Sequence, residues 1–211
     1  MAIHKEGYPF IALFAAVNLL AFLFAAWLGW VLLPLTVWCV AFFRDPERKA
    51  PEGENLVICP ADGRLLPVVE VAPPPELGMG DAPRVRLSIF MNVFNVHVNR
   101  NPVGGTVVAL SYRPGKFFNA SFDKASVHNE RMSVRLRATT GQELAVVQIA
   151  GLVARRIVCD LVQGQGVRAG ARFGIIRFGS RVDVYLPAGS EVLVTPGTVT
   201  RAGETVLARL V

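Results

Sequence analysis

The sequence predicts a mainly β protein, in which a single β-sandwich or barrel-like domain follows an N-terminal apolar helical membrane segment. An uncharged apolar run occupies the start of the chain, and short alternating or β-branched runs separated by Gly, Pro and Asn occupy the rest. Stretches with helical periodicity are scarce in that second part. We therefore divide the chain into a membrane segment, residues 1–43, and one globular domain, residues 44–211, which is long enough to form its own core.

The apolar run extends from Pro9 to Phe43 without a charged residue. A helix needs about 20 residues to cross a bilayer core, so the run is long for one span and short for two. Gly29 and Pro34 are positions at which it can break, and one long helix or two short helices both remain open. The run exceeds the apolar region of a cleaved signal peptide. Its tryptophans suit a membrane interface: Trp27, Trp30 and Trp38.

A basic segment, RDPERKA at residues 44–50, ends the apolar run. Pro46 stops a helix there, and Arg44, Arg48 and Lys49 place positive charge beside the membrane segment. Basic residues of this kind flank membrane segments on the cytoplasmic side. We therefore expect attachment to the cell membrane, with the following domain on its cytoplasmic face.

The strand-like runs follow one another at a spacing of about ten to fifteen residues, which is typical of a β-sandwich or barrel. They lie at residues 55–71, 84–92, 104–112, 132–140, 143–151, 155–162, 175–186, 191–197 and 204–211. Residues 116–130 are the one candidate for a helix, and their Asn and Ser content is equally compatible with a loop. The proline-rich residues 72–83 are predicted to form a surface excursion.

The composition excludes several classes of protein. The formal net charge is +6, from 22 Lys and Arg against 16 Asp and Glu. These basic residues are scattered singly, without interleaved aromatic residues, so we expect no nucleic-acid partner. We explain the excess of positive charge by a protein that is held against anionic lipid. Cys39, Cys59 and Cys159 are isolated, so the sequence predicts neither a metal site nor a disulfide scaffold.

Three short segments combine turn-forming residues with reactive side chains. Asp62 precedes a glycine between two apolar runs, and His97 alternates with valines in a predicted strand. The pair Gly179 and Ser180 interrupts the alternation of residues 175–186, although neither residue favours a strand interior. Each segment has a structural explanation, respectively a turn, a core histidine and a β-bulge.

A serine, a histidine and an aspartate in one domain can also form a hydrolase triad. The nucleophile motif GxSxG is absent here, because Ser180 directly follows Gly179 and precedes Arg181. A glycine before the serine leaves the preceding carbonyl sterically open, so that the serine hydroxyl can attack its own chain. The residues alone leave three functions open: cleavage of its own chain, hydrolysis of lipids, and a membrane-tethered β-domain that catalyses no reaction.

Five segments, in this order, resemble the short proenzyme form of phosphatidylserine decarboxylase: PADGR, FNVHVNRNPVGG, HNERMSV, IAGLVARRIV and RFGIIRFGSRVDVYLP. Each segment is weak alone, but their order is specific, and the likeness covers nearly all of residues 44–211. The resemblance implies autocatalytic cleavage of the bond between Gly179 and Ser180. The products would be a β chain of residues 1–179 and an α chain of residues 180–211, which remain together as a heterodimer and are compatible with a homo-oligomer.

The resemblance also implies the chemistry of the site. Ser180 would become a pyruvoyl group that forms a Schiff base with phosphatidylserine in the bilayer, giving phosphatidylethanolamine and CO2 without a metal or pyridoxal phosphate. His97 would act as base and then acid, and Asp62 would orient or assist it. Arg100 or Arg113 is expected to hold the lipid phosphate, because a guanidinium offers a planar bidentate fork.

Two positions depart from the family pattern. The commoner Leu-Gly-Ser-Thr motif is Phe-Gly-Ser-Arg here, at residues 178–181. Longer members carry a second histidine three positions after the first, where this sequence has Arg100. His97 is therefore the only histidine of the motif, which argues against a scheme with two histidines.

Overall fold

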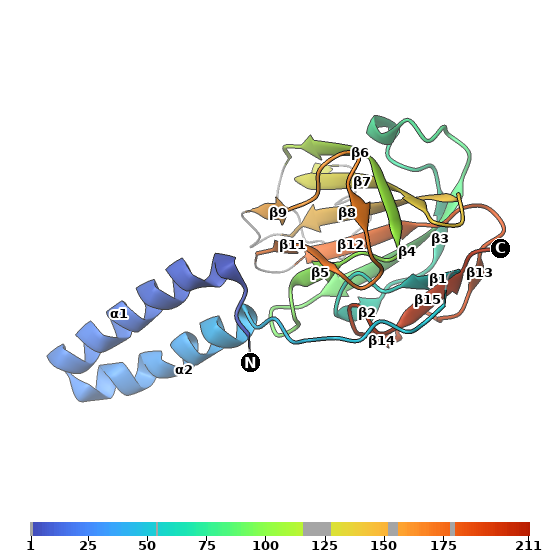
Figure 1. Cartoon of the computed structure of the whole chain (residues 1–211). Helices are drawn as coiled ribbons and strands as arrows, with labels where there is room; N and C mark the ends of the chain where they lie inside the picture. Colours follow the sequence, from blue (N-terminus) through green and yellow to red (C-terminus); the bar gives the residue numbers. More distant parts are fainter. Residues whose placement is uncertain (1, 54, 116–127, 152–155, 178–179) are drawn as a thin grey trace. The chain divides into compact units, whose positions relative to one another are not determined.

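The structure is a computed structural model that describes residues 2–53, 55–115, 128–151, 156–177 and 180–211. It separates into two compact units, Met1–Glu47 and Arg48–Val211. The first unit is helical and the second contains strands β1 to β15 (Figure 1). The predicted fold class, mainly β with N-terminal apolar helices, is confirmed.

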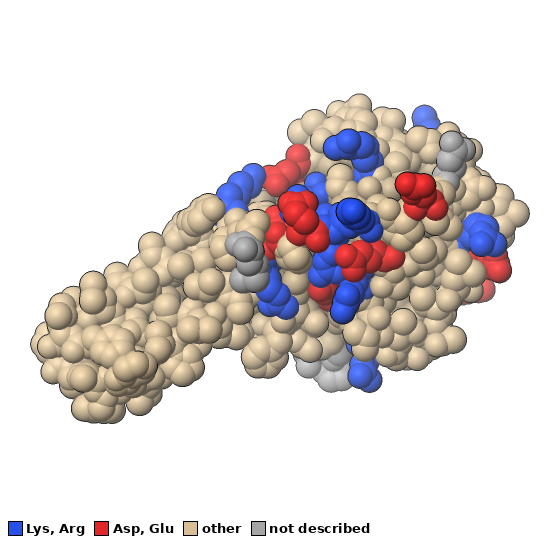
Figure 2. All heavy atoms as spheres, turned by 60° about the horizontal axis from the view of Figure 1, so that its bottom comes forward, with Lys and Arg blue, Asp and Glu red and all other residues tan. Residues whose placement is uncertain are grey.

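The first unit is an antiparallel helical hairpin. A 3-10 helix, η1 (Lys5–Gly7), leads into α1 (Tyr8–Phe24), and α2 (Ala26–Phe42) follows after the extended residue Ala25. The apolar run thus forms two helices, each about 25 Å long. The segment Lys5–Phe24 is long and apolar enough to cross a membrane by length and composition. Figure 2 shows that the visible surface of the hairpin is almost free of charged side chains.

Polar contacts hold the two helices side by side. The Asn18 amide donates to the carbonyl oxygen of Gly29 at 3.4 Å and to Thr36 Oγ1 at 3.3 Å, and Thr36 Oγ1 donates to the carbonyl oxygen of Phe14 at 3.4 Å. Hydrogen bonds between helices of this kind are the usual polar contacts of packed apolar helices. Gly29 permits the close approach, because a Cβ there would lie 2.3 Å from the ring of Phe22.

A large antiparallel sheet forms most of the second unit. Its strands run in the order β10-β6-β7-β8-β12-β4-β2-β14, and β3 also pairs with β4. Their bounds are β2 (Gly63–Leu65), β3 (Val69–Val71), β4 (Arg84–Met91), β6 (Gly105–Arg113), β7 (Arg131–Ala138), β8 (Glu143–Ala150), β10 (Gly166–Val167), β12 (Ser180–Tyr185) and β14 (Val199–Thr200).

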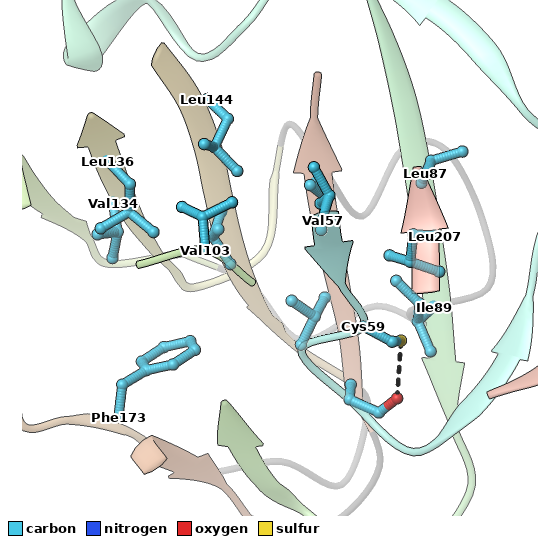
Figure 3. Packing of buried hydrophobic residues seen from close by; sticks show 14 of the residues in the cluster. Val57, Cys59, Leu87, Ile89, Val103, Val134, Leu136, Leu144, Phe173 and Leu207 are labelled. Carbon is cyan, nitrogen blue, oxygen red and sulfur yellow. Dashed lines mark hydrogen bonds between the residues drawn. The ribbon is translucent and has the colours of Figure 1, made fainter. Parts of the chain in front are cut away.

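Two smaller sheets complete the domain. One has the order β1-β15-β13, with β1 (Leu56–Ile58), β13 (Glu191–Val192) and β15 (Val206–Arg209). The other has the order β5-β11-β9, with β5 (Val98–Arg100), β9 (Ile157–Cys159) and β11 (Arg172–Ile176). All three sheets contribute to one hydrophobic core. Figure 3 shows side chains of the large sheet facing the same interior as residues from both small sheets, among them Val134, Leu136, Val57, Leu207 and Phe173.

The central strand β12 is buried along its whole length. Val182 and Val184 point into the main core. We call this side of the large sheet its inner face. The alternate residues Arg181, Asp183 and Tyr185 face the opposite side, here called the outer face. A short 3-10 helix, η2 (Pro75–Leu77), covers part of the outer face, where Leu77 packs with Tyr185 and with alanine, valine and isoleucine of β8.

The break in the alternation of residues 175–186 has a topological cause. The chain leaves the β5-β11-β9 sheet at Ile176 and enters the large sheet at Ser180. The two apolar runs are therefore strands of different sheets, and the interruption is a crossover between them rather than a bulge within one strand. Gly179 itself lies outside the described residues, as do residues 116–127 of the segment predicted as a helix or loop.

Gly63 sets the distance between β2 and β4, and its replacement should destabilise the domain. A Cβ at Gly63 would lie 2.2 Å from the carbonyl oxygen of Phe90, whereas one at Gly166 would meet no atom within 4 Å. Neither glycine has a positive φ, so the comparison isolates the clash. We expect Gly63→Ala to lower the melting temperature in circular dichroism by about 5 °C, corresponding to about 2 kcal/mol. Gly166→Ala is the control, and equal melting temperatures for both variants would contradict this account.

Candidate active site

Ser180 is the first residue of β12 and lies between two strands of the large sheet. Its backbone partners are Met91 in β4 and Ala150 in β8. By strand alternation its side chain shares the inner face with Val182. The side chain is fully buried, and its Oγ has no hydrogen-bond partner among the described residues. A buried hydroxyl in this state costs about 1–3 kcal/mol, and Ser88 of β4 is a second buried serine in the same state.

His97 immediately precedes β5 and is fully buried. Its carbonyl oxygen accepts a hydrogen bond from the backbone N–H of Ile176 at 3.4 Å, which continues the pairing of β5 with β11 up to the crossover. The imidazole Nδ1 lies 3.0 Å from the carbonyl oxygen of Asn95. Because a carbonyl oxygen only accepts, Nδ1 carries the proton in this contact, and Nε2 is the basic nitrogen of the neutral ring.

A pair of buried amides connects β5 with the strands around Ser180. Gln148 Nε2 donates to Asn99 Oδ1 at 2.8 Å, and Asn99 Nδ2 lies 3.7 Å from the sulfur of Met91. Met91 pairs with Ser180 along the backbone, and Gln148 pairs with Val182. Asn99 therefore faces the inner face of the large sheet close to Ser180.

His97 lies just outside β5 and two residues before Asn99, and both side chains are fully buried. The backbone of His97 pairs with Ile176 of β11, four residues before Ser180 in the chain. Asn99 and Gln148 are not among the residues predicted from the sequence, and the only signal for them is a polar residue within an otherwise apolar run.

Asp62 lies just before β2, at the edge of this region. Its Oδ2 accepts from Arg48 Nη2 at 2.9 Å, and its Oδ1 accepts from the backbone N–H of Ala202 at 2.7 Å. Arg48 also contacts Glu204 at 3.4 Å. Both carboxylate oxygens of Asp62 are therefore engaged by the N-terminal end of the domain and by the turn before β15, and neither of these contacts involves the imidazole.

Backbone contacts keep the Asp62 segment next to β5. The N–H of Arg100 donates to the carbonyl oxygen of Pro60 at 2.9 Å. The Arg100 side chain is buried, with its Nη1 donating to the carbonyl oxygen of Gly170 at 2.9 Å, and a Cβ at Gly203 would lie 2.7 Å from its Cδ. Arg100 and Asp62 thus belong to the same neighbourhood, whereas Arg100 faces away from the side of β5 that carries Asn99.

Arg113, the other predicted phosphate ligand, lies elsewhere. It is the last residue of β6, three strands from β12 in the large sheet, and its side chain is exposed. Three strand spacings correspond to about 14 Å. Arg113 therefore lies on a strand remote from that of Ser180.

The chemistry of the site depends on oxygen and nitrogen groups. Burial raises the pKa of the Cys59 thiol to about 12, so this nearby sulfur is a neutral thiol at physiological pH and a poor nucleophile. Within the part of the chain that the structure describes, no group of three or more His, Cys, Asp and Glu side chains is arranged to hold a metal ion. Buried serine, imidazole and amide groups are typical of an enzyme, here a domain of mainly β structure preceded by an apolar helical hairpin.

Comparisons with known proteins agree with this class. Residues 35–208 match the family described as Phosphatidylserine decarboxylase. The chain is 62% identical over 208 residues to the phosphatidylserine decarboxylase proenzyme of Paramagnetospirillum magneticum, covering 99% of this chain and 87% of that one. The corresponding proenzyme of Cereibacter sphaeroides is 58% identical over 207 residues, covering 98% and 89%, and that of Rickettsia africae is 56% identical over 206 residues with the same coverage.

The chain belongs to the phosphatidylserine decarboxylase family, which is a family of carboxy-lyases. The resemblance seen in the sequence is thereby confirmed.

The ion pair of Asp62 predicts a structural contribution that is measurable apart from any catalytic one. Asp62→Ala leaves the largely buried Arg48 without this carboxylate, so we expect the free energy of unfolding to fall by about 3 kcal/mol and the melting temperature by about 8 °C. Asp62→Asn keeps an acceptor for the Ala202 N–H and should lose less. A double-mutant cycle with Arg48→Ala measures the coupling, and additive effects of the two substitutions would refute the pair as a stabilising contact.

Proposed function

We propose that this protein decarboxylates phosphatidylserine to phosphatidylethanolamine and CO2, after cleaving its own chain before Ser180 and converting that residue into a pyruvoyl group. Family membership and the proenzyme names of its relatives support the reaction. The observation that carries the proposal is the position of Ser180, a buried serine whose Oγ has no hydrogen-bond partner among the described residues, at the point where the chain crosses between sheets.

Self-cleavage requires only the serine and a base. The Ser180 hydroxyl transfers its proton to the base and attacks the preceding carbonyl carbon, and the acyl group moves from nitrogen to oxygen to form an ester. Removal of the Cα proton of residue 180 then expels the carboxylate of residue 179 and leaves an unsaturated amine. Addition of water releases ammonia and leaves a keto group at residue 180. His97 is the proposed base, because it is fully buried, its backbone pairs with Ile176 just before the crossover, and Nε2 is its basic nitrogen.

The surroundings of residue 180 fit a keto group. The position is excluded from solvent, and Asn99 Nδ2 is a nearby donor whose described partner, the Met91 sulfur, is a weak acceptor. The pyruvoyl group, once present, supplies an electron-accepting carbonyl, so that pyridoxal phosphate and a metal are unnecessary. We infer that the Asn99–Gln148 pair holds this donor in place through the 2.8 Å hydrogen bond between the two amides.

Two further roles follow for residues of this site. His97 is the proposed acid that returns a proton to the carbon from which CO2 departs. Asp62 is proposed as a positioning residue: it fixes the segment that is bonded to β5 and thereby assists His97. Of the two arginines expected to bind phosphate, only Arg113 has an exposed side chain. Arg113 lies three strands from Ser180, so a phosphate bound to Arg113 would not belong to the headgroup that reacts at Ser180.

The hairpin suits a diacyl substrate. Extracting a lipid from the bilayer costs about 0.8 kcal/mol for each CH2 exposed, so a soluble site would rarely meet its substrate. An apolar helical hairpin keeps the domain at the membrane, and the basic residues 44–49 favour the cytoplasmic face. The proposed location is therefore the cell membrane with the enzyme domain in the cytoplasm.

Ser180→Ala should remain a single chain and release no CO2. The wild-type protein should yield fragments 1–179 and 180–211 in intact-mass analysis, the second without a free amino group, and should release labelled CO2 from carboxyl-labelled phosphatidylserine. The matched control is Ser88→Ala, which removes another buried serine from the neighbouring strand β4 on the outer face. An uncut wild-type chain would favour a non-catalytic domain, or a lipid hydrolase if fatty acid is released instead.

His97→Ala should slow self-cleavage by a factor of about 100 or more, because the serine hydroxyl loses its base. The measurement is the fraction of cleaved chain against time after purification of the uncleaved precursor. His4→Ala, in the helical hairpin, is the control and should cleave at the wild-type rate. Cleavage of the His97 variant at the wild-type rate would remove this histidine from the proposed mechanism.

A further inference from the structure

The outer face of the large sheet contains a pocket of about 500 Å³ that the proposed reaction does not use. Its walls are mainly apolar and come from β3 and the proline-rich segment that follows it. Its polar groups come from four strands of the large sheet, β6, β7, β12 and β4. The lining residues are Val69, Val71, Ala72, Pro73, Pro74, Pro75, Arg86, Arg113, Arg131 and Tyr185.

This pocket is separate from the Ser180 site. Tyr185 lines it and lies five residues after Ser180 on β12, so the two side chains point to opposite faces and are about 17 Å apart along the strand. The sheet itself stands between them. A single lipid headgroup, in which a few covalent bonds join phosphate and amine, cannot occupy both places.

The strand register concentrates arginines on the outer face. Arg113 pairs with Arg131, Arg131 pairs with Ile149, and Ile149 pairs with Arg181, so these residues form one row across four strands. Tyr185 pairs with Arg86 in a second row on the same face. Side chains of directly opposed residues lie on the same side of a sheet, so four guanidinium groups share this face.

Two carboxylates pair with three of these arginines. Glu76 accepts from Arg131 Nε and Nη2, both at 2.8 Å, and Asp183 contacts Arg181 at 2.8 Å and Arg86 at 3.9 Å. Arg113 forms no ion pair with any residue that the structure describes. Among these four arginines, and within the part of the chain that the structure describes, its exposed guanidinium is therefore the one that remains for a ligand.

The other polar groups complete a set of donors. Burial, with a further contribution from the charge of Asp183, raises the pKa of Tyr185, so its hydroxyl stays protonated and can donate a hydrogen bond. Guanidinium forks bind phosphate oxygens in a bidentate manner. The volume lies within the range of small-molecule sites, and inorganic phosphate alone would leave the valine and proline walls without a partner.

We propose that this pocket is a second ligand site, which binds the phosphate of an organic phosphate ester through Arg113 and Arg131 and packs its apolar part against Val69, Val71 and the prolines. A phospholipid headgroup and a soluble phosphate ester share this chemistry. The site is independent of Ser180 and of the reaction proposed above.

Glu76 acts as an internal competitor at this site. Burial alone would raise the pKa of its carboxyl, but hydrogen bonds from Arg131 and Ser133 outweigh this effect and lower it, so Glu76 is ionised at neutral pH. Its carboxylate occupies the guanidinium edge that a phosphate would use. Replacing it with a neutral amide should therefore strengthen binding.

The test is calorimetric titration of the full chain in nonionic detergent with two probes, glycerol 3-phosphate and dihexanoyl phosphatidylglycerol below its critical micelle concentration. We expect Arg113→Gln to weaken binding about tenfold and Glu76→Gln to strengthen it several-fold. Arg137→Gln is the matched control, because this exposed arginine of β7 pairs with Glu143 outside the pocket. The variant should bind both probes with the affinity of the wild type. Binding of the lipid probe alone identifies a headgroup site, and binding of both probes identifies a site for soluble esters as well.

Repeating the titration with Ser180→Ala separates this site from the reaction, since that variant should bind both probes as the wild type does. No binding of either probe, or equal affinity of wild type and a folded Arg113→Gln, would overturn the proposal whatever the outcome for decarboxylation. Circular dichroism verifies that each variant is folded.

Discussion

The burial of β12 on both faces is the constraint on which the rest of the structure depends. This strand pairs with β4 on one side and β8 on the other along all six of its residues, and every one of them is buried. Its inner side chains complete the apolar core, and its outer side chains form the Arg181–Asp183 ion pair. A strand held in this way places its first residue, Ser180, at a fixed point in the interior. The position of that hydroxyl is therefore set by the sheet and not by the crossover before it.

The same alternation separates two chemical environments. On the inner face, apolar contacts exclude water around Ser180 and the Asn99–Gln148 amide pair, which favours reactions that depend on a proton held at one atom. On the outer face, arginines outnumber the carboxylates that contact them, and the pocket there suits an anion. Because neighbouring residues of one strand face opposite sides, Ser180 and Arg181 belong to different sites although a single peptide bond joins them.

Local patterns predicted much of this structure. The apolar run and the strands that begin near Leu56, Arg84 and Glu143 follow from periodicity and turn chemistry. The position of the break in the apolar run does not: it falls at Ala25, whereas Gly29 and Pro34, where the sequence predicts a break, lie inside α2. The partners of those residues do not. Gln148 meets Asn99 because β8 and β5 belong to facing sheets, and Asp62 meets Arg48 because the N-terminal end of the domain returns past β2. Such contacts depend on strand order, which residue spacing along the chain does not encode. The change of sheet before Ser180 is invisible to residue spacing for the same reason, because alternation alone offers only a bulge as its structural explanation.

Strand order also explains how the domain can survive the proposed cleavage. The segment after the cut supplies β12 to the centre of the large sheet, β14 to its edge, and β13 and β15 to a second sheet. Its hydrogen bonds and its share of the core are therefore distributed over two sheets, and none of them requires the bond between residues 179 and 180 to be intact. Cleavage would create two chain ends, at residues 179 and 180. This arrangement would keep the new terminus of β12 between Met91 and Ala150 and would hold the two chains together as one domain.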